Sequence, residues 1–124
     1  MFDQMKAMGA IAGLLKNKDR IKEIGEEVQR RVERIRCIGT AGGGAARVTV
    51  SGRFQVLEVQ LDPSMIAGMY SDASGKAMGE SLIMEATNEA MQQAQAMIKE
   101  EVRRVAQEYE LPDLPGLDRM IGGG

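Results

Sequence analysis

The chain has 124 residues, enough for one domain, with no histidine, one cysteine and a net charge of −2. An internal disulfide is excluded, and the side chain used most often as a general base or metal ligand is missing. Aromatic residues make up 3% of the chain, so few large apolar side chains are available to form a core. Burial of apolar surface against a second copy is therefore favoured. No signal peptide or membrane-spanning segment is visible, and a cytoplasmic location is expected.

Charge is distributed unevenly along the chain. Residues 1–53 contain eleven basic and six acidic side chains, a balance of +5, whereas residues 54–124 contain five basic and twelve acidic ones, a balance of −7. This asymmetry predicts a basic surface on one part of the molecule. Either DNA or an acidic protein surface would complement it.

The first predicted element is a long helix from about residue 11 to residue 35. Apolar and small residues follow the 4-3-4-3 spacing of one helix face at Ile21, Gly25, Val28, Val32 and Ile35. A helix of that length measures about 35 Å, which exceeds the width of a small sheet. Part of it is therefore expected to project from the sheet or to pack against another subunit.

Residues 35–61 have the pattern of a three-stranded antiparallel meander. Apolar residues occupy alternate positions in 46–51 and again in 57–61, as in half-buried strands. A first strand is expected at 35–40.

Glycine and proline mark the boundaries of these strands. Gly42-Gly43-Gly44 permits the first reversal, and Ser51-Gly52-Arg53 is expected to form a tight turn with Gly52 at positive φ. Asp62-Pro63 ends the sheet, because proline donates no ladder hydrogen bond.

After the sheet, one helical turn is expected at 65–67 and a loop at 68–75, with Asp72 and Ser74 as candidate N-caps. A second long helix is predicted from residue 76 to residue 109. Its apolar stripe begins with small residues and continues with larger ones: Ile83, Ala86, Ala90, Ala94, Ile98, Val102, Val105 and Tyr109.

The second helix is expected to end at Leu111-Pro112, because a residue before proline avoids the α region. Glycine-rich residues 117–124 are predicted to form a flexible tail. The elements together predict an α+β fold of order α-β-β-β-α, in a single domain spanning residues 1–116.

The sequence does not indicate catalysis. Cys37 falls in a predicted strand without a histidine partner, which favours a packed thiol over a nucleophile. Gly42-Gly43-Gly44 leads into a strand and lacks the lysine and hydroxyl residue of a phosphate-binding P-loop, so a hairpin connection is the better interpretation. We expect no cofactor, no metal and no small-molecule substrate.

Several motifs occur in a characteristic order. A glycine triplet, an x-Val-x-Val strand, a short glycine turn and an alternating strand lead to Asp-Pro-Ser at 62–64. This order resembles that of the YbaB/EbfC family of small bacterial nucleoid-associated proteins. Residues 81–90 and 111–116 resemble the family's second helix and its Leu-Pro tail. The similarity covers about residues 10–116, with a linker at 65–75 that is longer than the family's.

The resemblance implies a tweezer-like homodimer, joined through its sheets, that holds its long helices outward with duplex DNA against or between them. Phosphate contacts of low sequence specificity would then associate the protein with the nucleoid. Residues 16–22 would stand near the last turns of the second helix. The basic residues expected to contact DNA are Lys16, Lys18, Arg20, Lys22, Arg30, Arg31, Lys99, Arg103 and Arg104.

Two alternatives stay open. Carboxylates are interleaved with the basic residues of both helices, so these residues could instead form ion pairs on a solvated helix face. The negative net charge also fits a protein-interaction or scaffold dimer whose projecting helices bind another protein.

Overall fold

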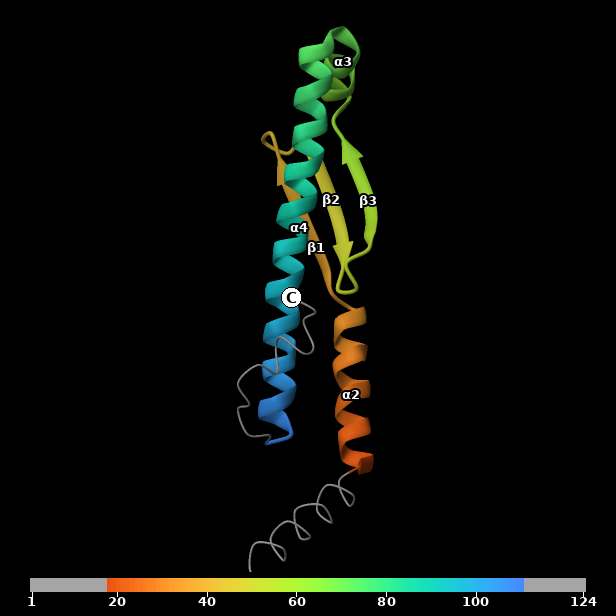
Figure 1. Cartoon of the computed structure of the whole chain (residues 1–124), viewed down its shortest axis with the longest axis vertical. Helices are drawn as coiled ribbons and strands as arrows, with labels where there is room; N and C mark the ends of the chain where they lie inside the picture. Colours follow the sequence, from red (N-terminus) through yellow and green to blue (C-terminus); the bar gives the residue numbers. More distant parts are fainter. Residues whose placement is uncertain (1–17, 111–124) are drawn as a thin grey trace, which may run out of the picture.

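The computed structural model describes residues 18–110 as an elongated molecule with its sheet in the middle (Figure 1). Its elements are α2 (Lys18–Glu33), β1 (Arg36–Ala41), β2 (Ala46–Ser51), β3 (Val56–Leu61), α3 (Pro63–Ser71) and α4 (Ala73–Glu108). The predicted α+β class, with an antiparallel meander between two long helices, is confirmed. The predicted start of the first helix at 11–17 and the predicted tail at 117–124 lie outside the described residues.

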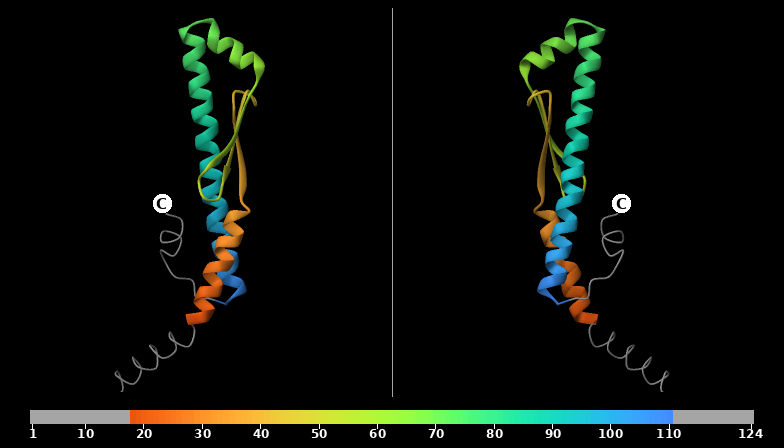
Figure 2. Two further views of the ribbon diagram at one scale, coloured as in Figure 1. Left: turned by 90° about the vertical axis from the view of Figure 1, so that its right-hand side faces the viewer. Right: turned by 90° about the vertical axis from the view of Figure 1, so that its left-hand side faces the viewer.

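The three strands pair in the order β1-β2-β3, and both pairs are antiparallel. Cys37 lies opposite Val50 and Gly39 lies opposite Val48, all on one face of the sheet. Helix α4 covers this face, chiefly over β1 and β2 (Figure 2). Cys37, Val48 and Val50 are buried beneath it, so the alternation predicted for residues 46–51 is confirmed.

Strand β3 differs from its neighbours, because α4 leaves it largely uncovered. Val56, Leu57 and Val59 each keep close to half of their surface exposed. Val59 pairs with the buried Val48, so both side chains project to the side of the sheet that carries α4. The half-buried strand predicted at 57–61 is therefore an exposed edge strand with an apolar row.

Small residues allow α4 to lie close to the sheet. Ala86, Ala90 and Ala94 are fully buried, and they continue into the larger buried residues of the predicted stripe. Gly39 of β1 sits directly under this helix: a Cβ atom built there would lie 2.0 Å from the carbonyl oxygen of Ala86 and 2.5 Å from the amide nitrogen of Ala90. The helix backbone thus occupies the space that any side chain at residue 39 would need.

Glycine has a different role in each of the two hairpin turns. Gly42, Gly43 and Gly44 all have positive φ, as the first reversal requires. The prediction that Gly52 has positive φ is wrong, because Phe54 adopts that conformation, with φ of 60°. Gly52 is needed for space instead: a Cβ atom there would lie 2.2 Å from the carbonyl oxygen of Val32. The hairpin can therefore approach the end of α2 closely.

The loop predicted at 68–75 is wrong. Helix α3 continues through Ser71 and α4 begins at Ala73, so Asp72 alone separates them. Asp72 is extended, and its Oδ1 accepts a hydrogen bond of 2.6 Å from the amide of Gly75, which confirms it as the N-cap. A Cβ atom on Gly75 would lie 2.1 Å from the carbonyl oxygen of Gly68. The glycine at 75 therefore serves close packing between two helices.

We expect Gly39→Ala to lower the free energy of unfolding by about 3 kcal/mol or more, because the new methyl group would collide with helix backbone. Gly25→Ala is the matched control. Gly25 lies in α2 with no atom within 4 Å of a built Cβ, so alanine there should stabilise by up to about 1 kcal/mol. Urea denaturation of both variants measures the difference, and equal stability of the two would contradict the packing described.

Candidate nucleic-acid interface

Helix α2 and the last turns of α4 extend together beyond one end of the sheet, here called the open end (Figures 1 and 2). The two helices run antiparallel and are in contact. Val28 and Val32 of α2 pack against the edge of the core. Further out, the Arg20 guanidinium donates a hydrogen bond to the carbonyl oxygen of Tyr109. The projection expected for part of the first helix is confirmed.

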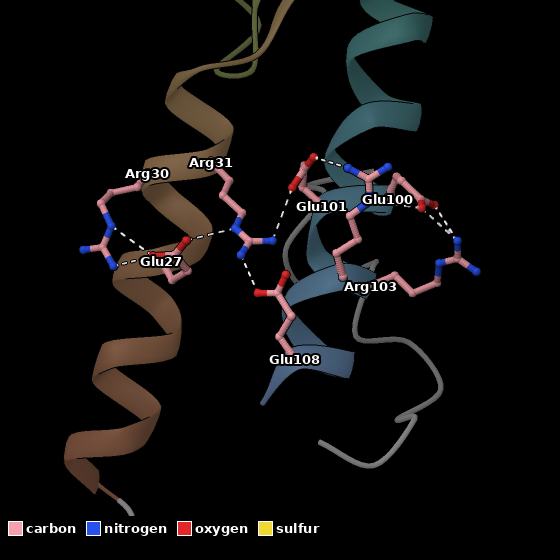
Figure 3. Close-up of polar contacts among 8 residues, drawn as sticks. Glu27, Arg30, Arg31, Glu100, Glu101, Arg103 and Glu108 are labelled. Carbon is pink, nitrogen blue, oxygen red and sulfur yellow. Dashed lines mark hydrogen bonds and ion pairs between the residues drawn. The ribbon is translucent and has the colours of Figure 1, made fainter. Parts of the chain in front are cut away.

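Four arginines and four glutamates join the helices at the open end in an interhelical ion-pair network (Figure 3). Its members are Glu27, Arg30, Arg31, Glu100, Glu101, Arg103, Arg104 and Glu108. Equal numbers of opposite charges make the network neutral. Within residues 18–110, it contains four of the nine cations predicted to contact DNA.

Arg31 forms the link between the helices. Its Nε donates to Glu27 on its own helix at 2.9 Å, and its other nitrogens reach Glu108 and, at 3.6 Å, Glu101 of α4. The Arg31 side chain is 21% exposed, so these pairs are partly shielded from water. Arg31 therefore connects α2 to α4 and has little of its guanidinium free for another anion.

Hydrogen bonds within the network favour the charged forms of Glu27, Glu100 and Arg31. Hydrogen bonds from Arg30 and Arg31 lower the pKa of Glu27, and the hydrogen bond from Arg103 is the largest cause of the lowered pKa of Glu100. Hydrogen bonds to Glu108 and Glu27 raise the pKa of Arg31. All of these groups are consequently ionised at neutral pH.

The predicted site residues fall into four groups. Arg30, Arg31, Arg103 and Arg104 belong to the network, Arg20 is bonded to a backbone carbonyl, and Lys16 lies outside the described residues. The remaining three are exposed and form no ion pair within residues 18–110: Lys18, Lys22 and Lys99.

These three lysines are spread along the open end. Lys18 and Lys22 lie in the outer half of α2. Lys99 lies nearer the sheet, two residues after Met97, whose sulfur is 3.3 Å from the Cys37 Sγ of β1. The structure therefore brings Arg20 to the end of α4, but it places Lys99 at the inner limit of the projecting part.

Three arginines outside the nine bear on the charged surface. Arg34, Arg36 and Arg47 are exposed and form no ion pair in the part of the chain that the structure describes. Arg36 and Arg47 alternate with buried residues, so they lie on the sheet face opposite α4. Strand alternation in the sequence was the signal that could have placed them there.

Three further properties of residues 18–110 concern metal ligands, membrane-spanning helices and the cysteine. These residues contain no group of three or more potential metal ligands and no helix long and apolar enough to cross a membrane. The Cys37 thiol is buried, and its desolvation raises its pKa.

A shallow, largely apolar hollow of about 630 Å³ lies at the end of the molecule opposite the open end. It is lined by Leu61, Ile66 and Tyr70, among others.

We expect Arg31→Ala to loosen the open end, because it leaves three carboxylates on facing helices without their shared cation. Amide hydrogen exchange should accelerate in α2 and the last turns of α4 while it stays slow in β1 and β2. Arg34→Ala removes the same charge from an unpaired, exposed position and is the control. Equal exchange rates in the two variants would show that Arg31 does not hold the helices together.

The sequence is similar to a family of known proteins. The model of the YbaB/EbfC DNA-binding family matches residues 8–109. A nucleoid-associated protein of Bordetella avium is 32% identical over 109 residues, which cover 88% of this chain and 94% of that protein. One of Chlorobium phaeobacteroides is 32% identical over 81 residues, or 65% and 67% of the two chains. One of Clostridium acetobutylicum is 27% identical over 106 residues, or 86% and 90%.

Among solved structures, the crystal structure of an uncharacterized protein from Helicobacter pylori is similar, with a TM-score of 0.48 and 20% identity. The match covers 73% of this chain and 95% of that one.

Proposed function

Because the chain belongs to the YbaB/EbfC DNA-binding family, we propose that it binds duplex DNA as a homodimer, mainly through phosphate contacts and with low sequence specificity. It would act in the cytoplasm as a component of the nucleoid, with a role in nucleoid organisation and gene regulation. The family is one of DNA-binding proteins and not of enzymes.

The observation that carries this proposal is the set of exposed, unpaired lysines along the open end. Lys18 and Lys22 lie in the outer half of α2, and Lys99 lies in α4 where the projecting part begins. Each presents a mobile point charge, which suits contacts to the regularly spaced phosphates of any duplex. Two subunits would double the number of such contacts and thereby raise the affinity.

The apolar edge strand supports the homodimer. Val56, Leu57 and Val59 form an exposed row on β3, and the backbone of this outer strand has no partner on its free side within residues 18–110. Exposed apolar edge strands favour association with another chain. A second copy of this chain is the partner that the family resemblance implies.

Removing an unpaired lysine at the open end should weaken binding to duplexes of any DNA sequence. We expect Lys22→Ala and Lys99→Ala each to reduce affinity for several unrelated duplexes by a similar factor. Each lost phosphate contact should also flatten the plot of log K against log salt by about 0.9. Electrophoretic mobility shifts or fluorescence anisotropy at three salt concentrations measure both effects.

Lys76→Ala is the matched control for Lys99→Ala, because both are exposed lysines of α4 without ion pairs in the described structure. Lys76 lies at the opposite end of the helix and should leave affinity and salt slope unchanged. If the wild-type protein binds no duplex at low salt, DNA binding fails and a protein-interaction dimer becomes the better interpretation.

Val59→Asp should dissociate the homodimer, because it places a charge in the apolar row of β3. Gln60→Asp is the control. Gln60 is the next residue of the same strand, and its pairing with the exposed Arg47 places it on the other face of the sheet. Sedimentation should give a monomer for the first variant and a dimer for the second. A wild-type protein that sediments as a folded monomer at micromolar concentration would overturn the dimer.

A further inference from the structure

Glu100 holds two arginines of its own helix at once. The Nη2 of Arg103 lies 2.8 Å from each of the two carboxylate oxygens of Glu100, and the Nε of Arg104 lies 3.5 Å from one of them. Residues three and four positions apart share a face of a helix, so one carboxylate at position 100 reaches both guanidinium groups. Within residues 18–110, Glu100 is the acidic partner of Arg103, and it shares Arg104 with Glu101, whose Oε1 lies 3.1 Å from the Nη1 of Arg104.

This part of the interhelical ion-pair network is much more accessible than the part around Arg31. The side chains of Arg103, Arg104 and Glu100 are 66%, 57% and 42% exposed, against 21% for Arg31. Exposed pairs within one helix contribute little to stability, so their separation costs little. Within residues 18–110, Glu100 pairs with α4 arginines alone, and the links from α2 to α4 through Arg31 do not depend on it.

A DNA phosphate can take the place of this carboxylate. Guanidinium groups bind the oxygens of carboxylates and phosphates alike, and a single nitrogen of Arg103, Nη2, already contacts both oxygens of Glu100. The phosphodiester carries one negative charge, as Glu100 does. After the exchange, however, the freed carboxylate of Glu100 would remain beside the DNA and repel it.

We propose that Glu100 is an intramolecular competitor of DNA: it occupies Arg103, and Arg104 jointly with Glu101, in the free protein, and phosphates displace it on binding. This inference rests on the proposed DNA binding and adds a control of its strength. Glu100 reduces both the affinity and the number of counterions released, since it pairs with Arg103 and contributes to the pairing of Arg104. The lowered pKa of Glu100 keeps the competing carboxylate ionised at neutral pH.

The variant Glu100→Gln tests the proposal. It preserves the size and helix propensity of the side chain and removes its charge. We expect DNA binding to tighten by roughly threefold to tenfold, as Arg103 becomes available and Arg104 keeps only its pair with Glu101. The salt slope should steepen by about 0.9 per subunit, the contribution of the freed Arg103.

Two comparisons separate competition from a general change in charge. Glu23→Gln removes the same charge from α2, also at the open end, where Glu23 is exposed and forms no ion pair in the described part of the chain. This variant should tighten binding clearly less than Glu100→Gln. When Arg103→Ala and Arg104→Ala are added to Glu100→Gln, the gain in affinity and slope should disappear.

The outcomes distinguish this inference from the function on which it rests. If the wild-type protein binds DNA and Glu100→Gln tightens binding no more than Glu23→Gln, competition by Glu100 is overturned while DNA binding stands. A gain that survives the loss of both arginines overturns it as well. If neither the wild type nor Glu100→Gln binds duplex at low salt, both proposals fail. An unchanged thermal unfolding midpoint for Glu100→Gln confirms that the comparison concerns folded protein.

Discussion

Close contact between α4 and the first two strands is the interaction on which the rest of the structure depends. Ala86, Ala90 and Ala94 bring the helix backbone within reach of β1, and Gly39 leaves the space that this approach requires. Such a core buries many small groups at high density in place of a few large ones, which fits a chain with 3% aromatic residues. Because α4 is anchored in this way, its continuation past the sheet has a defined direction, and α2 has a fixed surface to pack against.

The sequence predicted those parts of the fold that depend on local pattern. The alternation of apolar residues predicted the strands, and the spacing of small residues predicted the buried stripe of α4. The order of the motifs predicted the family, and the comparisons confirm that family. Errors arose where a glycine has two possible uses. Gly52 and Gly75 were assigned to turn and loop conformations, but both leave space for the backbone of another element. That use depends on residues distant in sequence, so no local pattern reveals it.

The candidate site was less predictable, because the availability of a cation depends on its neighbours in space. Sequence spacing showed that i,i+3 and i,i+4 pairs were possible, but it gave no means to separate Lys22, which has no pair in the described residues, from Arg31, which has three. Two of the carboxylates around Arg31, Glu101 and Glu108, come from α4, about seventy residues further along the chain. Only the packing of α2 against α4 brings these charges together. The unpaired lysines emerge as the best candidates once the paired arginines are recognised.

The continuity of α4 has a mechanical consequence for the open end. This helix runs for 36 residues with neither a proline nor a break, and it is fastened to the sheet along its middle. Its projecting part is therefore a rigid extension of the core. Helix α2 is attached differently, because it joins β1 through the short segment Arg34-Ile35, where the helix gives way to extended backbone. If the gap between the two helices widens, α2 must pivot about this joint while α4 stays in place, so the two arms of the open end are mechanically unequal.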